Sequence, residues 1–256
     1  MKKLFFISDA HLGAQDTEQE QLKSDRLVSW LRFIGQQDGD LVICGDLFDF
    51  WFEYRRVIPR LHFPVLAELA LFTSSGRSVH YLTGNHDFWM GSFMTEQLGL
   101  CLHEGEWTVQ HGGYRIYLHH GDGLKKRDAA YRLLKKILRH SWSISLYRLL
   151  HPDLGVPLAL FFSRLSRNVT REITDLDSRR FASRKIDDGF ELVVLGHTHW
   201  PALQKYRGGW YLNPGNWMDA FTYAVLEPDG PRLYSWNGRE GCPIPPPPEP
   251  PANSTA

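Results

Sequence analysis

The stretch Asp40-Leu41-Val42-Ile43-Cys44-Gly45-Asp46-Leu47-Phe48-Asp49 joins a short apolar run to a cluster of small and acidic residues. An apolar run of this length, bounded by polar residues, predicts a buried strand. Four other apolar runs end in the same way, and the five clusters share glycine, aspartate, asparagine and histidine. They are Asp9-x-His11, Gly45-Asp46-x-x-Asp49, Gly84-Asn85-His86-Asp87, His120-Gly121-Asp122 and Gly196-His197-x-His199. Because the carboxyl ends of strands in an α/β sheet converge on one crevice, we expect the clusters to meet there.

Helical segments alternate with apolar runs in the first half of the chain, which is typical of an α/β protein. Residues 100–120 should form two strands, and Gly112-Gly113 between them predicts a hairpin, so the expected fold class is mixed α/β. The other expected strands are 4–8, 40–44, 78–83, 191–195, 202–206, 210–213, 222–227 and 232–236, and the expected helices lie around Trp30 and over 61–75.

The strand pattern is absent between about 128 and 188, where His151-Pro152 and Gly155-Val156-Pro157 interrupt apolar residues at helical spacing. Several short helices are expected there, inserted into a domain that covers 1–241. The proline-rich segment 242–256 predicts an extended or disordered tail. No apolar run approaches the roughly 18 residues of a membrane span, and the apolar start is too short for a signal peptide. We therefore expect a cytoplasmic protein.

Charge is unevenly distributed along the chain. The 29 basic and 29 acidic residues cancel, yet segment 125–185 contains 15 Lys and Arg against 5 Asp and Glu. The three cysteines are odd in number and widely spaced, which argues against a disulfide framework and against a structural zinc site. The three thiols are therefore expected to be buried or incidental.

The five clusters offer carboxylate, amide and imidazole groups without a thiolate, which suits Mn²⁺, Fe²⁺, Zn²⁺ or Ni²⁺. Seven candidate ligands are more than one tetrahedral ion can use, so the pattern predicts two ions. Asp46 is the expected bridge, because one anionic group between two cations reduces their repulsion. A histidine beside a glycine is by itself more often a hydrogen-bonded loop residue. The prediction depends on all five clusters following apolar runs.

The ordered motifs D-x-H, G-D-x-x-D, G-N-H-D, H-G-D and G-H-x-H resemble those of the calcineurin-like metallophosphoesterase superfamily. Within it, the chain is more closely similar to the UDP-2,3-diacylglucosamine hydrolases of lipid A biosynthesis, up to about Pro228. This resemblance implies an αββα sandwich of mixed sheets with a helical lid at about 128–188. The stretches that carry it are Ser8-Asp9-Ala10-His11-Leu12-Gly13, Gly45-Asp46-Leu47-Phe48-Asp49-Phe50-Trp51, Gly84-Asn85-His86-Asp87-Phe88, and His120-Gly121-Asp122-Gly123-Leu124 followed by Asp128 and Tyr131.

The same resemblance implies two divalent ions, with manganese as the metal. One ion would be held by Asp9, His11, Asp46 and His199, and the second by Asp46, Asn85, His120 and His197. Since side chains alternate along a strand, His119 should point away from the site that His120 enters.

His86 is expected to protonate or stabilise the leaving oxygen, oriented by Asp87, while a metal-activated water attacks phosphorus. The best-known lipid A hydrolases have G-N-R-D at this cluster. His86 therefore departs from their pattern at a position that bears on the choice of substrate.

The basic segment from Lys125 to Arg139 interleaves Lys and Arg with Leu and Ile, which is typical of a helix on an anionic membrane surface. The resemblance implies a lid that admits acyl chains and rests on the cytoplasmic face of the inner membrane. Two alternatives are a helix packed on the core with its charges in water, and a single-stranded nucleic-acid surface. Aliphatic rather than aromatic partners argue against nucleic acid. The expected substrate contacts are Asn85, His86, Asp128, Tyr131, Ser166, Asn168, Arg171 and His197.

The function that the resemblance implies is hydrolysis of the pyrophosphate bond of UDP-2,3-diacylglucosamine, giving UMP and 2,3-diacylglucosamine 1-phosphate. One alternative is a broader metal-dependent phosphodiesterase or nucleotide pyrophosphatase. Another is a membrane adaptor without enzymatic activity. The complete ligand set favours an enzyme.

Overall fold

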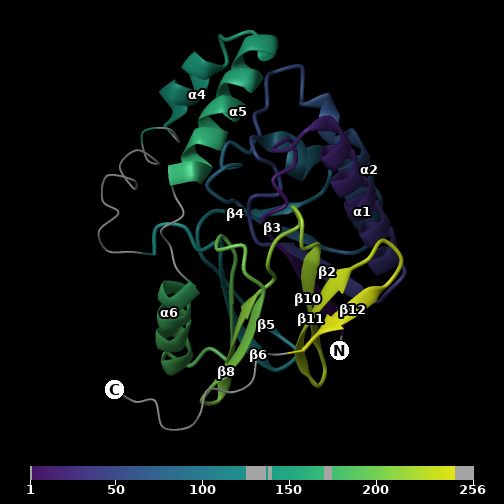
Figure 1. Ribbon diagram of the computed structural model, residues 1–256, viewed down its shortest axis with the longest axis vertical. Coiled ribbons are helices and arrows are strands. Elements are labelled where there is room, and N and C mark those ends of the chain that lie inside the picture. The colour runs from purple at the N-terminus through teal and green to yellow at the C-terminus, as the bar shows by residue number, and fades with distance from the viewer. Residues whose placement is uncertain (1, 125–136, 138–139, 170–174, 246–256) are drawn as a thin grey trace.

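The computed structural model describes residues 2–124, 137, 140–169 and 175–245, without the side chains of 141 and 164–169 (Figure 1). Two β-sheets lie between helices α1 (Thr17–Gly35) and α2 (Phe63–Ser74) on one side and helix α6 (Asp175–Asp187) on the other. This order of layers is the expected αββα sandwich.

The first sheet has seven strands and mixed direction. Its strands are β1 (Lys3–Ile7), β2 (Gly39–Ile43), β3 (Val79–Leu82), β4 (Cys101–His103), β10 (Thr222–Glu227), β11 (Gly230–Trp236) and β12 (Gly241–Ile244). Their order is β12-β11-β10-β1-β2-β3-β4. Strands β1 to β4 run parallel to one another, whereas β1 pairs with β10 in the antiparallel direction. The carboxyl ends of β1, β2 and β3 therefore lie at the same edge.

The second sheet has five strands in the order β5-β6-β7-β9-β8. They are β5 (Trp107–His111), β6 (Tyr114–His119), β7 (Leu192–Leu195), β8 (Ala202–Tyr206) and β9 (Gly209–Asn213). The expected hairpin at Gly112-Gly113 is confirmed as the turn between β5 and β6. One further strand in this region, β4, was not expected, and it extends the first sheet.

Both faces of the first sheet are buried along its central strands β1, β2, β3 and β10, which explains why these strands are mostly apolar runs. In β1, Leu4 and Phe6 pack in the core between the two sheets, whereas Phe5 and Ile7 pack with residues of α1 and α2. This alternation follows from the two-residue repeat of a strand. The core thus fixes which face each strand presents and where its last residue lies.

Two further helices, α4 (Ser141–Tyr147) and α5 (Pro152–Val169), project beyond one end of the sheets (Figure 1). Pro157 lies in the second turn of α5, and the helix continues through it. The expected interruption at Gly155-Val156-Pro157 is therefore wrong, although a proline at this position removes one hydrogen bond of the helix. Helix α6 instead packs on β7 and β9. The expected lid boundary at 188 is therefore corrected: α6 belongs to the outer layer of the sandwich.

The predicted tail also begins later than expected. Residues 241–244 form β12, whose Pro243 is paired with Tyr234 of β11. A proline is tolerated here because β12 is the edge strand of its sheet, where one N–H has no neighbour to bond. Residues 246–256 of the predicted tail lie outside the described residues, as does most of the basic segment 125–139. Among the described helices, none is both long and apolar enough to cross a bilayer.

His62 ends the short helix η1 (Arg60–His62) and is 5% exposed, with its ring against Phe48 and Trp51. Burial and the nearby charge of Lys23 lower the pKa of His62 from 6.5 to about 3. The folded state therefore keeps this ring neutral at pH values where the unfolded chain protonates it.

We expect His62 to make the protein sensitive to acid. Its contribution to stability is complete above pH 6.5 and is lost as the pH falls toward 3. Between pH 7.5 and pH 5, His62 alone should lower the free energy of unfolding by about 2 kcal/mol. Urea unfolding at both pH values measures this loss, and His62→Phe should reduce it by that amount. An equal loss in the variant would contradict the assignment.

Candidate metal centre

All seven predicted ligands lie in loops that follow parallel strands. Asp9 and His11 follow β1, Asp46 follows β2, and Asn85 follows β3. The other three come from the second sheet, with His120 after β6 and His197 and His199 after β7. The two sheets therefore deliver their polar ends to one place, as the strand pattern predicts.

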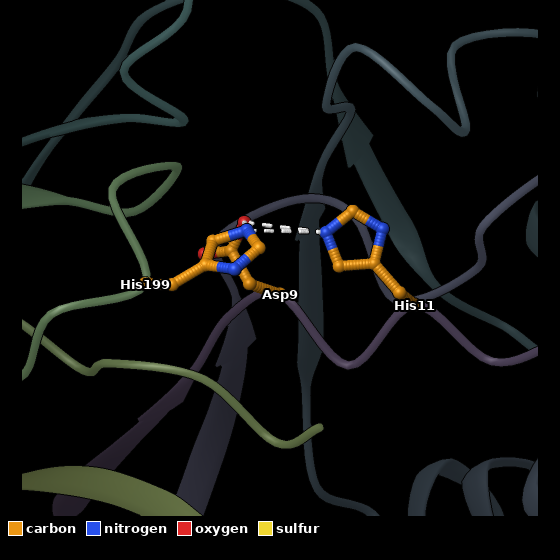
Figure 2. Close-up of side chains that lie close together, drawn as sticks. All are labelled: Asp9, His11 and His199. Carbon is orange, nitrogen blue, oxygen red and sulfur yellow. Dashed lines mark hydrogen bonds and ion pairs between the residues drawn. The ribbon is translucent and has the colours of Figure 1, made fainter. Parts of the chain in front are cut away.

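The first group of ligands consists of Asp9, His11 and His199, whose side chains point toward one another (Figure 2). The Nε2 atom of His199 lies 3.3 Å from Asp9 Oδ1 and 3.3 Å from His11 Nε2. Asp9 and His11 are fully buried, and Asp9 Oδ1 has no hydrogen-bond partner among the described residues. Two imidazole nitrogens and a carboxylate oxygen without a donor fit a divalent cation.

The second group consists of Asp46, Asn85, His120 and His197. His120 Nε2 lies 3.2 Å from Asp46 Oδ2, 3.0 Å from Asn85 Oδ1 and 3.3 Å from His197 Nδ1. An amide oxygen, a carboxylate oxygen and two imidazole nitrogens thus converge at a second point.

Asp46 lies between the two groups. Its Oδ2 atom is 3.2 Å from His120 Nε2 and 3.8 Å from His11 Nε2, while Oδ1 accepts a hydrogen bond from the His86 N–H at 2.9 Å. One carboxylate oxygen therefore faces ligands of both groups. This is the position that a bridging carboxylate requires.

The backbone is strained at the predicted ligands. Seven described residues other than glycine have a positive φ, and five of them are predicted ligands. Such a conformation costs about 1–3 kcal/mol per residue and persists only where the surrounding structure imposes it. The five are Asp9 at 53°, His11 at 43°, Asp46 at 51°, His197 at 70° and His199 at 61°.

Backbone hydrogen bonds between loops impose these conformations. The N–H groups of Asp9 and His11 donate to the carbonyl oxygens of Gly45 and Asp46, at 3.1 and 2.9 Å. The loop from the second sheet is attached in the same way, because the His197 N–H donates to Asp9 Oδ2 at 2.9 Å. The ligand loops thus form one connected unit.

Two further contacts orient the imidazole rings, as is usual for metal-binding histidines. His11 Nδ1 lies 3.3 Å from Asp49 Oδ1, and His120 Nδ1 donates to the Cys44 carbonyl oxygen at 2.9 Å. Both contacts direct Nε2 toward the cluster. Asp49 is a functional residue without a predicted role, although its place in the G-D-x-x-D motif was a signal for one.

The predicted pairing of His86 with Asp87 is wrong. His86 Nδ1 lies 2.8 Å from Ser163 Oγ on α5 and 3.7 Å from Asp49 Oδ1. The buried Asp87 carboxylate instead accepts hydrogen bonds from the Tyr81 hydroxyl and, at 2.9 Å, from the Gly84 N–H. The Phe48 N–H in the loop after β2 also donates to Asp87 Oδ2, at 3.3 Å. Asp87 therefore holds its own loop and joins it to the loop after β2.

The remaining predicted residues are placed as follows. His119 Nδ1 accepts a hydrogen bond from the Gly121 N–H at 2.9 Å and takes no part in the ligand groups. Asp128, Tyr131 and Arg171 lie outside the described residues, and so do the side chains of Ser166 and Asn168 on α5.

The side chains of the centre shift one another's pKa values, which keeps the Asp46 carboxylate charged and makes His120 much more basic than His197. Burial opposes ionisation of Asp46, but the neighbouring histidines, His120 first, hold its pKa well below the usual range. Burial lowers the pKa of His120, but the Asp46 carboxylate outweighs it and raises the pKa to about 10. Burial and the charge of His120 lower the pKa of His197 to about 4. A cation would therefore displace a proton from His120 and meet a neutral His197.

Residues 2–201 match the calcineurin-like phosphoesterase family, and the chain belongs to it. Among its relatives, a UDP-2,3-diacylglucosamine hydrolase of Porphyromonas gingivalis is 34% identical over 166 residues, which are 64% of this chain and 63% of that protein. The match thus spans less than two thirds of that relative's length. A protein of the same name from Neisseria meningitidis is 28% identical over 235 residues, covering 90% of this chain and 95% of the relative. The expected resemblance to a metal-dependent hydrolase family is confirmed.

Gly84 tests the geometry of the centre, because a Cβ atom at this position would lie 2.0 Å from Asp46 Oδ1. Gly84→Ala must displace the Asp46 carboxylate, and we expect the affinity for Mn²⁺ to fall at least about tenfold. Equilibrium dialysis followed by elemental analysis measures this loss. Gly208→Ala is the matched control, since nothing lies within 4 Å of a Cβ there. Equal metal binding by the two folded variants would contradict the proposed role of Asp46.

Proposed function

We propose that the protein hydrolyses the pyrophosphate bond of UDP-2,3-diacylglucosamine to UMP and 2,3-diacylglucosamine 1-phosphate. The convergence of the six other predicted ligands around Asp46 carries this proposal. Relatives that bear this activity in their names, one of them aligned over nine tenths of the chain, support the choice of substrate.

The proposed centre holds two divalent ions, with Mn²⁺ as the metal. Asp9, His11 and His199 would hold one ion, Asn85, His120 and His197 would hold the other, and Asp46 would bridge them. Two cations in such a site lower the pKa of a water and neutralise charge on phosphoryl oxygens. Asp49 and the Cys44 carbonyl fix the rings of His11 and His120 in the productive orientation.

His86 is the proposed general acid. Its Nδ1 atom is held by Ser163 and lies near Asp49, so Nε2 is the atom that we assign to the leaving oxygen. The ring stands edge-on to His11 with centroids 4.7 Å apart, which places it beside the first ligand group. Asp49 replaces Asp87 as the nearby carboxylate that can stabilise the protonated ring.

Helices α4 and α5 supply apolar surface next to this centre. Ser163 of α5 reaches His86, and the same helix exposes Leu154, Phe161 and Phe162 to 69%, 62% and 57%. Exposed apolar side chains gathered on one helix indicate an interaction with lipid or another apolar surface. We assign this face of α5 to the acyl chains and to the cytoplasmic face of the inner membrane.

A cavity of about 740 Å³ lies beneath α4, in the size range of sites for small ligands. Aromatic and aliphatic side chains share its wall with three arginines and three glutamates, and none of the predicted metal ligands lines it. This lining suits an acyl chain rather than the phosphates of the substrate. Its lining includes Phe52, Trp89, Met90, Phe93, Ile144 and Arg148. The contacts expected from Asp128, Tyr131, Ser166, Asn168 and Arg171 remain part of this proposal.

A broader phosphodiesterase or nucleotide pyrophosphatase is the second candidate. One observation favours it: the His199 side chain is 35% exposed, so water and small esters can reach the first ligand group. His86 in place of the arginine of the best-known lipid A hydrolases points the same way.

Turnover of three substrates separates these candidates. We expect the Mn²⁺-reconstituted protein in mixed micelles to have a kcat/KM for UDP-2,3-diacylglucosamine at least about 100-fold above that for UDP-glucose or bis-p-nitrophenyl phosphate. Such a ratio equals about 2.7 kcal/mol of additional transition-state binding, within reach of two buried acyl chains. Comparable values for the soluble esters would favour the broader enzyme, and Asp46→Ala provides the blank.

His86→Ala should lower kcat for the diacylated substrate by about 10²–10⁴-fold and leave metal content unchanged, since general acid catalysis contributes this much. Ser163→Ala should cause a smaller loss, because it removes only one of the contacts of the ring. Stopped-flow or discontinuous release of UMP measures both. A loss below tenfold in His86→Ala would remove His86 from this role.

The apolar face of α5 is tested by Phe161→Ser with Phe162→Ser. We expect KM for the micellar substrate to rise at least about tenfold, because burying each phenylalanine contributes about 1.5–3 kcal/mol. Hydrolysis of bis-p-nitrophenyl phosphate should not change. The control is Leu71→Ser on α2, where a leucine is 63% exposed on a different helix. Equal KM values for both proteins would argue against an acyl-chain site on α5.

A further inference from the structure

Lys23 lies in the second turn of α1 and its side chain is completely buried. Its Nζ donates a hydrogen bond to the carbonyl oxygen of His11 at 2.7 Å and forms an ion pair with Glu20 Oε2 at 3.0 Å. A buried ammonium group is costly unless it is paired and hydrogen-bonded. This lysine therefore reaches from α1 to the backbone of a proposed metal ligand.

Glu20 contacts the same loop from the same helix. Its Oε1 accepts a hydrogen bond from the Gly13 N–H at 2.7 Å, and its Oε2 accepts one from the Gln15 N–H at 3.3 Å. The Glu20 side chain is also buried, at 6% exposed. The Glu20 carboxylate thus accepts hydrogen bonds from N–H groups of the loop, and the Lys23 ammonium group donates one to a carbonyl oxygen of the loop. The two opposite charges neutralise each other.

We propose that Glu20 and Lys23 are positioning residues of the metal centre, which hold the backbone of His11 in the conformation that its ring needs to reach the first ion. This inference rests on the proposed metal site and adds a part of the chain outside the five polar clusters. Neither side chain is a ligand, because Lys23 contacts the carbonyl oxygen of His11 and Glu20 contacts the loop that follows.

The backbone of His11 has the unusual conformation that Glu20 and Lys23 would stabilise. With φ at 43°, His11 has a backbone that a residue with a side chain rarely adopts, and its carbonyl oxygen accepts from both Lys23 and the Ala14 N–H. Asp49 separately orients the His11 ring through Nδ1. Backbone and ring are thus fixed by different groups, and removing the backbone contact should shift Nε2 while the Asp49 contact remains available.

The burial of the Glu20–Lys23 pair indicates that its function is to hold the loop and not only to stabilise the fold. A pair of well-packed apolar residues can fill the space of a buried ion pair without loss of stability. Side-chain hydrogen bonds of the pair reach residues 11, 13 and 15, all in the loop between β1 and α1. An apolar pair could replace the packing, but it could not hold the His11 carbonyl oxygen.

The test is Mn²⁺ binding to the full-length metal-free protein, measured by calorimetric titration and by electron paramagnetic resonance. Lys23→Met keeps the length and removes the charge. Glu20→Gln keeps the shape of Glu20 and leaves Lys23 in place. The control is Arg32→Met, which removes an exposed basic residue of the same helix that pairs with Glu68. Circular dichroism establishes whether each variant is folded.

We expect Lys23→Met to weaken one of the two Mn²⁺ sites by about 10–100-fold, the usual effect of losing a group that supports a ligand. The other site should change by less than about twofold. At two equivalents of Mn²⁺ the native protein and Arg32→Met should give the spectrum of a coupled pair, and Lys23→Met that of a single ion. Glu20→Gln should weaken the same Mn²⁺ site by less than Lys23→Met does.

Native binding of both ions by folded Lys23→Met would overturn the proposal. If Lys23→Met does not fold, native binding by Glu20→Gln overturns it, and selective loss of one ion supports it. If neither variant folds, the pair is a folding determinant and the proposal is also overturned. Failure of the proposed lipid substrate would leave these binding curves unchanged. Failure of the metal site itself would show in the native protein.

Discussion

The carboxylate of Asp46 is the one charge that both halves of the metal centre share. It is buried, its backbone is left-handed, and its Oδ2 lies near a histidine from each ligand group. Glycines at 45 and 84 leave the space that it and His120 occupy, because a Cβ at either position would come within 2.4 Å of one of these side chains. The surrounding loops are arranged so that this carboxylate faces both groups of predicted ligands, of which the first also contains the Asp9 carboxylate.

The two sheets make that arrangement possible. Each sheet alone supplies an incomplete set: β1 to β3 deliver the carboxylates, the amide and His11, whereas β6 and β7 deliver the remaining histidines. The apolar core between the sheets fixes their separation, and the His197 N–H to Asp9 contact joins the loops across it. Strain in five ligand residues is thus balanced by packing and by backbone hydrogen bonds elsewhere. Helix α5 adds Ser163, so the helix that we assign to the acyl chains also contacts His86.

Sequence patterns predicted much of this because strands buried on both faces are visible as apolar runs, and motif order carries the ligand set. The sequence patterns did not predict the roles of residues whose partners are fixed only by the three-dimensional fold. Asp87 follows His86 in the chain, yet its oxygens turn toward Tyr81 and Gly84, and Ser163 reaches His86 from 77 residues away. The roles of Lys23 and Glu20 were also invisible, because charged residues in the first turns of a helix usually face water. Edge strand β12 was missed because prolines dominate its surroundings.

The most direct test of a two-ion centre built around Asp46 is anomalous diffraction from crystals of the Mn²⁺-reconstituted protein. Two peaks about 3.5–4 Å apart are expected, one beside Asp9, His11 and His199 and the other beside Asn85, His120 and His197, with Asp46 in contact with both. A single peak, or two peaks of which neither contacts Asp46, would contradict such a centre.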